Sequence, residues 1–452
     1  MCTEKTFFHT LEIDEALCIG CSYCVSVCPT EAFRVKNGKS VLLSNQCVDC
    51  GKCALVCPTD AINFNQDDFE HIFEHKYRVA IIPSVFIGQF PESISVNLIY
   101  NAIKKVGFTH VYGAGNSVKI IKDELHKYQD NHPEKPLIST FCPAIVRLIQ
   151  VRFPFLVDHL ILQKTPLDLS VQFVNKELVA QGIDKKDIGI FYITPCAAKT
   201  VAIKDPLGGY EIPIAGTINM DVMYNKIYGY IRRKEVEETE QLYETNLSPE
   251  GILYSLTGGE KQLAKGKSFA IDGIHNVINF LEKVENDEIT GIDFLELRAC
   301  DESCAGGVLT TNNKFLTVDR LKTLAKEKLE KPENTNPCFA PISNRRDELT
   351  ENMATEKVLP RSMMKLDDNI NEAFKKMQEV NEILSKLPNV DCTMCGAPNC
   401  KSLAKDIVQG RATIEHCIFI QKQLEEKGSM TPDESAEKFK SIWGNKTEKM
   451  KI

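Results

Sequence analysis

The stretch DIGIFYITPCAAK, residues 187–199, indicates the fold of the largest part of this chain. From Ile188 to Thr194 its residues are mostly apolar or β-branched, which is typical of a buried strand. Cys196 follows this run almost directly. Helical apolar spacing occurs elsewhere, as in residues 95–107 and 276–285. Three other short runs are strand-like: YRVAIIPS (77–84), PLIST (136–140) and DFLELRA (293–299). The sequence therefore predicts an α/β fold with parallel sheets for this region.

Cysteine distribution and composition divide the chain of 452 residues into four segments. Its length allows about two to four domains. Residues 1–75 contain two similar runs of four cysteines and are predicted as a small α+β domain, and residues 76–330 are the α/β region. Residues 331–387 are predicted as a linker, rich in Pro, Asn and Glu, followed by an amphipathic helix. Residues 388–452 are predicted as a small, mainly helical domain that ends in a charged, frayed tail of about 25 residues.

The amphipathic segment has apolar residues at helical spacing, and we expect this stripe to pack in a core. The stripe consists of Ile370, Ala373, Phe374, Met377, Val380, Ile383, Leu384 and Leu387.

The composition excludes several classes of protein. The net charge of −8 argues against a nucleic-acid partner, whose binding surface would be basic. The N-terminus has no apolar core of a signal peptide, and the longest apolar stretch, residues 146–163, is interrupted by charges and should not span a membrane. We therefore expect a cytoplasmic protein. There its 18 cysteines should stay reduced and be available as ligands for zinc or iron–sulfur clusters.

The N-terminal cysteines have the spacing Cys-x2-Cys-x2-Cys-x3-Cys-Pro, first in residues 18–29 and again in residues 47–58. This is the bacterial ferredoxin spacing, in which the fourth cysteine of each run reaches the other cluster. The pattern predicts two 4Fe–4S clusters, one held by Cys18, Cys21, Cys24 and Cys57 and the other by Cys47, Cys50, Cys53 and Cys28. Zinc is the alternative, but structural zinc usually has its ligands in two separated pairs. The region resembles two-cluster ferredoxins over roughly residues 10–65, which implies an electron conduit.

Four cysteines of the α/β region are scattered in sequence: Cys142, Cys196, Cys300 and Cys304. The first three follow strand-like runs. Because ligand sites in α/β sheets form outside the carboxyl ends of strands, these residues can converge on one point. On spacing alone, four unrelated buried cysteines are the alternative, because free cysteine is often buried.

The residues around these cysteines resemble the signature segments of the iron–iron (FeFe) hydrogenases. The matching segments are TFCP (140–143), TPCAAK (194–199) and ELRACDESCAGG (296–307). IIPSV (81–85) resembles the family's segment beside its diiron site, and residues 272–300 resemble the stretch that leads into its last motif. The resemblance covers about residues 10–310.

The resemblance implies that the four cysteines hold the family's H-cluster. This cofactor is a 4Fe–4S cluster bridged through one cysteine sulfur, here that of Cys304, to a diiron unit with CO, cyanide and a bridging dithiolate. Pro83 and Ser84 match the segment beside the diiron unit. Lys199 matches the lysine that hydrogen-bonds a cyanide ligand, a pairing that suits a cation and an anion.

Phe141 departs from the family pattern, because catalytic members have a proton-shuttling cysteine there. An ungapped count from Cys142 puts Ile121 and Ile161 at two positions of the family's proton relay and leaves Glu124 as the outer glutamate. A positioned proton donor contributes about 10²–10⁴-fold in rate, so we expect weak turnover. Loss of this cysteine resembles the sensory hydrogenases, although these usually have a residue smaller than phenylalanine. Four further positions differ from the family: Leu167 for a glutamine, Thr194 and Arg298 for methionines, and Ala202 for a glutamate.

The C-terminal cysteines follow the pattern Cys392-x2-Cys395-x4-Cys400-x16-Cys417. The pattern resembles the C-terminal 4Fe–4S module of redox and corrinoid proteins, and it also fits the sensory hydrogenases. An all-cysteine zinc site is the alternative. Cys2 and Cys338 have no partner spacing, and no role is assigned to them. The predicted cofactors are thus three 4Fe–4S clusters and an H-cluster.

Three hypotheses for the function follow. The first is an FeFe hydrogenase that binds H2 or slowly and reversibly oxidises it to protons and electrons, as an H2 or redox sensor with a signalling partner at the C-terminal cluster. The second is a working hydrogenase with a different proton path that exchanges electrons with ferredoxin or another redox protein. Both imply hydrogenase maturation proteins as partners. The third is a non-catalytic iron–sulfur scaffold or electron carrier, although Lys199 and the Pro83–Ser84 pair favour a diiron unit.

Overall fold

The computed structural model forms two compact units, residues 66–360 and residues 1–65 together with 361–452. It describes residues 8–133, 136–206, 212–237, 247–330, 339, 341–361, 366–367 and 369–445. Cys2 and Cys338 lie outside these described residues.

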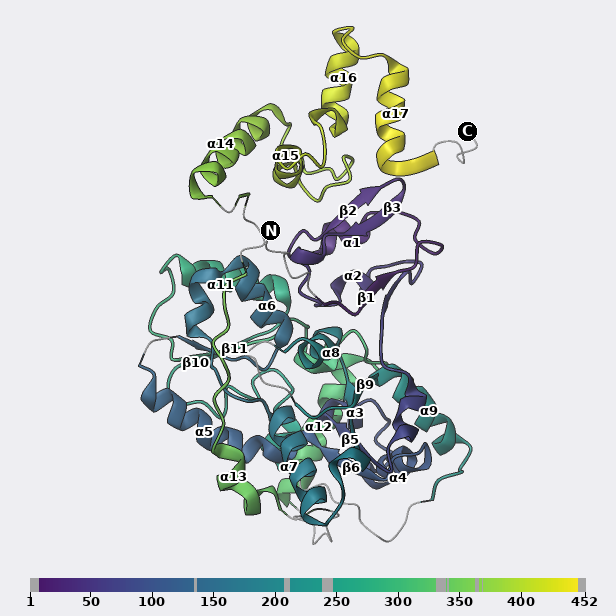
Figure 1. Ribbon diagram of the computed structural model, residues 1–452, viewed down its shortest axis with the longest axis vertical. Coiled ribbons are helices and arrows are strands. Elements are labelled where there is room, and N and C mark those ends of the chain that lie inside the picture. Colours follow the sequence, from purple (N-terminus) through teal and green to yellow (C-terminus); the bar gives the residue numbers. More distant parts are fainter. Residues whose placement is uncertain are drawn as a thin grey trace. The chain divides into compact units, whose positions relative to one another are not determined.

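Two parallel sheets form the framework of the unit of residues 66–360 (Figure 1). The four-stranded sheet has the order β6 (His110–Gly113), β5 (Tyr77–Ile82), β8 (Ile188–Thr194) and β9 (Gly216–Asn219). The three-stranded sheet has the order β10 (Ser268–Ile271), β11 (Phe294–Leu297) and β7 (Leu137–Ile138). All neighbouring strands pair in parallel. The predicted α/β fold is confirmed, and the four strand-like runs are β5, β7, β8 and β11.

The four-stranded sheet is buried because helices cover both of its faces. Ala80 and Ile82 of β5 pack into one core, whereas Val79 and Ile81 pack into the other, as alternating side chains of a strand do. The first core includes residues of α4 (Val96–Lys105), α9 (Met220–Arg232) and α12 (Lys314–Glu330). The second includes residues of α5 (Val118–Asn131) and α7 (Pro166–Ala180). The apolar composition of the strands, without clear alternation, follows from this double coverage.

Other short helices of this unit connect the strands and carry much of the site. They are α3 (Ser84–Ile87), α6 (Pro143–Arg152), α8 (Ala197–Lys204), α10 (Pro249–Leu253), α11 (Ile274–Glu285) and α13 (Arg346–Thr350).

Part of the predicted linker packs against this unit instead of running free. Phe339, Leu349 and Met353 belong to the same core as β5 and α7, and Val358 is also buried. These apolar side chains explain the difference, because their burial removes apolar surface from water. Residues 331–338, 340 and 362–365 of the segment lie outside the described residues.

The other unit begins with two small two-stranded sheets. β1 (Leu11–Ile13) pairs with β4 (Ile62–Phe64), and β2 (Phe33–Lys36) pairs with β3 (Lys39–Leu42), both antiparallel. Two short helices, α1 (Tyr23–Val27) and α2 (Lys52–Leu55), each carry the third cysteine of a run. The predicted α+β class of this segment is confirmed.

The C-terminal part of the same unit is helical and packs against β2. It consists of α14 (Ile370–Lys386), α15 (Cys400–Val408), α16 (Ile418–Glu426) and α17 (Pro432–Trp443). The predicted frayed tail is wrong in the described residues, because α17 begins with a Thr431–Glu434 capping box and buries Ile442. The stripe of α14 is only partly buried: Val380 is fully buried, whereas Phe374 is 68% exposed.

Among the described residues, none of the helices has the length and apolarity needed to cross a membrane.

Candidate functional site

The cysteines of the central unit lie near the carboxyl ends of strands from both sheets. β8 ends at Thr194, and Cys196 caps the N-terminus of α8. Cys142 follows β7 and caps α6, and Cys300 comes three residues after the end of β11. This is the placement that the strand-like runs of the sequence predict.

A strained turn carries the third cysteine motif. Glu302 and Ser303 have φ angles of 59° and 56°, a left-handed conformation that is uncommon for residues with a side chain. The backbone N–H of Glu302 donates to Asp272 Oδ2 at 2.9 Å. A Cβ atom on Gly307 would lie 2.4 Å from the carbonyl oxygen of Pro195, so only glycine allows this approach. The turn thus brings the third motif against the second one.

Three thiols of the motifs lie close enough to influence one another's charge. Burial is the main cause that raises the pKa of Cys196 to about 12; Lys199 opposes this effect, and Cys304 and Cys142 add to it. Burial also raises the pKa of Cys304, again opposed by Lys199. The Lys199 ammonium is thus close enough to affect the charge of both Cys196 and Cys304. Cys300 lies in the turn that precedes Cys304, where the N–H of Ser303 donates to its carbonyl oxygen at 3.1 Å.

A cavity of about 350 Å³, partly open to solvent, adjoins these residues. Four of the predicted site residues line it together: Pro83, Ser84, Phe141 and Lys199. Ser84 Oγ donates to the Ile252 carbonyl oxygen at 2.8 Å, which fixes this hydroxyl group. Glu124, the fifth predicted residue, lies apart on α5 and forms an ion pair with Lys127 at 2.7 Å.

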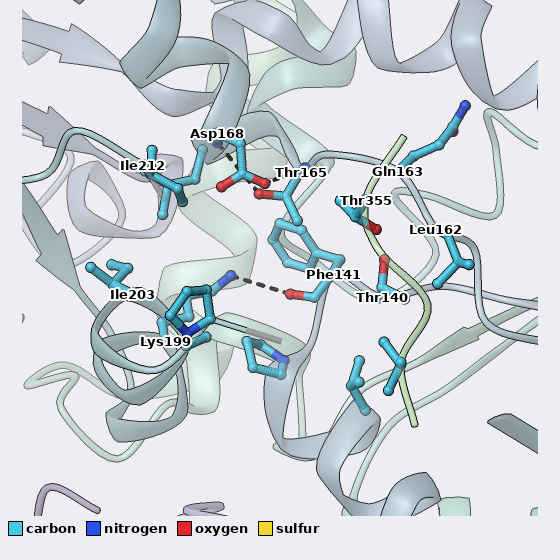
Figure 2. Close-up of a pocket in the computed structure, with 16 residues that line it drawn as sticks. Thr140, Phe141, Leu162, Gln163, Thr165, Asp168, Lys199, Ile203, Ile212 and Thr355 are labelled. Atoms are coloured by element: carbon cyan, nitrogen blue, oxygen red, sulfur yellow. Dashed lines mark hydrogen bonds between the residues drawn. The ribbon is translucent and has the colours of Figure 1, made fainter. Parts of the chain in front are cut away.

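The ring of Phe141 forms part of the cavity wall and contacts two cationic side chains. Lys199 Nζ lies 4.0 Å from the centre of the Phe141 ring, and Arg298 Cζ lies 4.1 Å from it. Lys199 also donates to the Phe141 carbonyl oxygen at 3.3 Å. Figure 2 shows Phe141 and Lys199 on the wall of a neighbouring cavity, together with Thr165 and Asp168. The aromatic ring therefore separates the cavities and contacts both cations.

A further cavity lies beside Phe141, and both apolar and polar side chains line it. Ile121 and Ile161 line it, at the positions that the ungapped count relates to the family's proton relay. Tyr254 and Glu260 line it too, and Tyr254 also lines the cavity of Ser84 and Lys199. A phenol thus lies between the two cavities.

The sequence reasoning missed a buried polar network next to Phe141. Glu260 accepts hydrogen bonds from Ser139 Oγ and from the Tyr254 hydroxyl, and it pairs with Arg298 Nη2 at 2.9 Å. Glu296 also pairs with Arg298 and is fully buried. The one signal in the sequence was an arginine within an otherwise strand-like run, since a buried guanidinium needs an acidic partner.

Cys28 and Cys57, the last cysteines of the two N-terminal runs, accept matching backbone hydrogen bonds. Cys28 Sγ accepts from the N–H of Ala32, and Cys57 Sγ accepts from the N–H of Ala61, both at 3.3 Å. Hydrogen bonds to sulfur of this kind are among the factors that tune iron–sulfur clusters. Burial raises the pKa of Cys50 to about 12, and the charge that adds most to this effect is that of Cys28, the fourth cysteine of the other run.

The C-terminal cysteines converge in the second unit. Burial raises the pKa of Cys395 to about 11, and the charges of Cys392 and Cys417 add to this. Cys400 heads α15, and its N–H donates to Asp391 Oδ1 at 2.7 Å. His416 lies beside Cys417, but its Nδ1 accepts from the N–H of Thr413 at 3.0 Å, which is a capping role.

The donor atoms suit anionic iron clusters. Buried thiols with raised pKa values stay protonated unless a metal supplies positive charge. Soft sulfur ligands select iron–sulfur clusters or zinc. In the central site two cations face the sulfur atoms, and Arg298 Nη1 has no hydrogen-bond partner among the described residues although it is buried. A donor without an acceptor is costly, and the sulfur atoms of a bound cluster would satisfy it.

Fold and site together fit an iron–sulfur redox protein, and comparison with known proteins shows what its parts resemble. The family model "Iron only hydrogenase large subunit, C-terminal domain" matches residues 76–209. The model "4Fe-4S dicluster domain" matches residues 17–62, and a further model for an Fe–S cluster matches residues 387–419. Residues 76–209 of this chain therefore match a domain of iron-only hydrogenases.

The chain is similar to two curated proteins over parts of their length. "Iron hydrogenase 1" of Clostridium pasteurianum is 24% identical over 344 residues, which are 68% of this chain and 57% of that protein. "Ferredoxin-2" of Desulfomicrobium norvegicum is 46% identical over 33 residues, 7% of this chain and 56% of that protein. The matches therefore span little more than half of either relative.

Among solved structures, a variant of [FeFe]-hydrogenase HydA1 from Chlamydomonas reinhardtii has a TM-score of 0.46 at 15% identity. The match covers 63% of this chain and 94% of that one.

Proposed function

We propose that this chain binds H2 and slowly, reversibly oxidises it to two protons and two electrons at an H-cluster, as an H2 or redox sensor. The observation that carries the proposal is a single cavity lined by Lys199, Ser84 and Phe141 beside the thiols of the three hydrogenase motifs. Two features of the sequence matter here. The site has four cysteines that can serve as ligands, and residue 141 is a phenylalanine, which has no thiol. The first feature favours the cofactor, and the second favours low turnover.

The proposed cofactors follow the cysteine sets of the sequence. Cys142, Cys196, Cys300 and Cys304 would hold the H-cluster, whose iron supplies the chemistry of H2 activation when bound. The ammonium of Lys199 would bind an anionic ligand of its diiron unit, and Pro83 and Ser84 would shape the pocket. Three 4Fe–4S clusters would be held by the two N-terminal sets and by the C-terminal set. Loading of the diiron unit would require maturation proteins.

Slow turnover is expected because the wall of the cavity lacks a proton donor at residue 141. A phenylalanine ring has no exchangeable proton, and a positioned donor is worth about 10²–10⁴-fold in rate. Ile121 and Ile161 in the adjoining cavity are equally unable to carry protons. Oxidation of each H2 would release two electrons to the clusters together with two protons, so slow proton transfer would limit repeated turnover while a single oxidation could still reduce the clusters.

The arrangement of the C-terminal module supports a relay of electrons within the second unit. Gly396 lies in the loop between Cys395 and Cys400, and its carbonyl oxygen accepts the N–H of Val35 in β2 at 2.8 Å. Ile442 packs in the same core as Cys24 and Cys53. The C-terminal cluster would thus lie against the ferredoxin-like clusters and could pass their redox change to a signalling partner.

A working hydrogenase with another proton path is the second candidate. The observation in its favour is the Tyr254–Glu260 hydrogen bond of 2.9 Å between the two cavities. Such a protein would exchange electrons with ferredoxin or another redox protein.

The test combines infrared spectroscopy with a hydrogen-evolution assay of the matured protein. CO and cyanide bands are expected, and their absence would favour an iron–sulfur scaffold or electron carrier. The sensory proposal expects low turnover that Phe141→Cys raises. The second candidate instead expects high turnover of the parent protein, which Glu260→Gln abolishes and Phe141→Cys leaves unchanged. That result would refute the first candidate.

A further inference from the structure

Arg298 occupies an unusual position next to the cluster cysteines. Arg298 is 1% exposed and lies two residues before Cys300, at a position where the resemblance to the hydrogenases implies a methionine. Its guanidinium lies over the ring of Phe141, with Cζ 4.1 Å from the ring centre. The two departures from the family pattern, at residues 141 and 298, are therefore in direct contact, and cation–π attraction explains why they suit each other.

Two carboxylates hold the guanidinium from its other sides. Glu260 pairs with Nη2 at 2.9 Å, and Glu296 pairs with Nε at 3.4 Å. Nη2 also donates to the Tyr254 carbonyl oxygen at 3.3 Å. The oxygens of Glu296 additionally accept the backbone N–H groups of Gly258 and Lys261, so this carboxylate is itself fixed. The orientation of the guanidinium is thus determined by contacts on three sides.

One nitrogen of the guanidinium remains without an acceptor. Nη1 is buried and makes no hydrogen bond within the described part of the chain. Nη2 donates to the carbonyl oxygen of Tyr254, and the carbonyl oxygen of the next residue, Ser255, accepts the N–H of Cys304 at 3.2 Å. The buried donor Nη1 therefore lies beside the segments that carry Cys142, Cys300 and Cys304.

We propose that Arg298 is a positioning residue for the cluster: Nη1 donates to an anionic sulfur of the 4Fe–4S cluster held by Cys304, and Phe141 keeps the guanidinium there. The inference rests on the ligand set of the proposed function. Phe141 then has a role of its own as a support for Arg298, in addition to lacking a shuttling thiol.

The consequence is a shift in reduction potential. Reduction of the cluster adds one electron from an external reductant, here dithionite, and breaks no bond and moves no proton. A fixed cation and a hydrogen bond to sulfur stabilise the added negative charge. The cluster is therefore reduced at a higher potential than it would be beside a methionine, which suits a site that responds to small amounts of H2.

The experiment is a redox titration of the full chain with reconstituted 4Fe–4S clusters but without the diiron unit, followed by electron paramagnetic resonance. The signal that disappears in Cys196→Ser identifies the central cluster among the others. Arg298→Met should make its reduction at least tenfold less favourable, equivalent to about 59 mV for one electron. Arg320→Met is the matched control, because it removes a buried guanidinium that instead donates to the Ile94 carbonyl oxygen, and it should leave the potential unchanged.

Arg298→Met leaves two buried carboxylates without their partner and risks misfolding. Two variants that keep the positive charge, Phe141→Leu and Arg298→Lys, test the inference in that case. Both should lower the reduction potential of the cluster. Phe141→Leu would loosen the guanidinium, and Arg298→Lys would remove the Nη1 donor. Unchanged or higher potentials in both variants would overturn the inference while leaving the proposed function intact. If no signal depends on Cys196, the ligand set itself is wrong, and the proposed function fails together with the inference.

Discussion

A buried ion pair between Arg34 and Asp406 joins the N-terminal and C-terminal segments of one unit, although 372 positions separate them in sequence. Arg34 Nε donates to Asp406 Oδ2 at 2.5 Å, and both side chains are 6% exposed. Asp406 also accepts from Arg411 Nη2 at 2.6 Å. Asp406→Asn preserves the shape of the side chain but removes its charge. We predict that it destabilises the contact between the helical module and the ferredoxin-like segment more than the loss of an exposed ion pair does.

The magnitude follows from what the substitution leaves behind. Removal of one charge of a buried pair costs about 3–5 kcal/mol. The lower end applies here, because Arg34 Nη1 keeps the carbonyl oxygens of Glu31 and Phe33, at 2.7 and 2.8 Å. Arg411 is partly exposed and can be hydrated. The expected loss in the free energy of unfolding of this unit is therefore about 3 kcal/mol, roughly a 100-fold change in the equilibrium constant.

Fluorescence of Trp443 during urea unfolding measures this loss directly. It is the chain's single tryptophan, and its Nε1 donates to the Met394 carbonyl oxygen at 2.9 Å in the same unit. Glu372→Gln is the control, since its pair with Lys375 on α14 is exposed and should contribute under about 1 kcal/mol. If Asp406→Asn unfolds within 1 kcal/mol of the parent, like the control, the buried pair does not hold the two segments together.

Three further changes test other parts of the structure. Cys395→Ser should remove about four iron atoms per chain, measured by iron analysis, while the other cluster signals persist. Phe173→Ala empties a fully buried position between α7 and the sheet and should cost about 3–5 kcal/mol in thermal or urea unfolding; a smaller cost contradicts the described core. Burial raises the pKa of Glu31, but hydrogen bonds from Ser402 and Asn399 outweigh it and lower the pKa below its ordinary 4.5. Its stabilising effect is thus present above pH 4.5 and is lost as the pH falls through the folded value, so Glu31→Gln should flatten the acid side of the stability curve.

The sequence predicts those features that depend on residues a few positions apart, such as buried strands and the spacing of cysteine ligands. The run 187–199 is strand-like because its apolar residues must be buried, and it is β8 with Cys196 at its end. The ferredoxin-like spacing predicts that Cys28 belongs with the other run, and the effect of the Cys28 charge on the pKa of Cys50 favours this prediction. These features depend on composition and on residues a few positions apart.

Tertiary structure decided which distant residues meet. No spacing rule relates Arg298 to Phe141 or to Glu260, and their contact exists because β7, β11 and the loop after α10 converge. The described part of the predicted linker packs into the core because its few apolar residues find a partner surface, which composition alone does not reveal. The predicted tail forms α17 because the turn after β2 donates hydrogen bonds to the carbonyl oxygens of Ser441 and Ile442, and Ile442 also packs in the core of the ferredoxin-like segment. Sequence determined the ligand chemistry of this protein, whereas the charges around the ligands depend on long-range packing, and so does the pairing of its two ends in one unit.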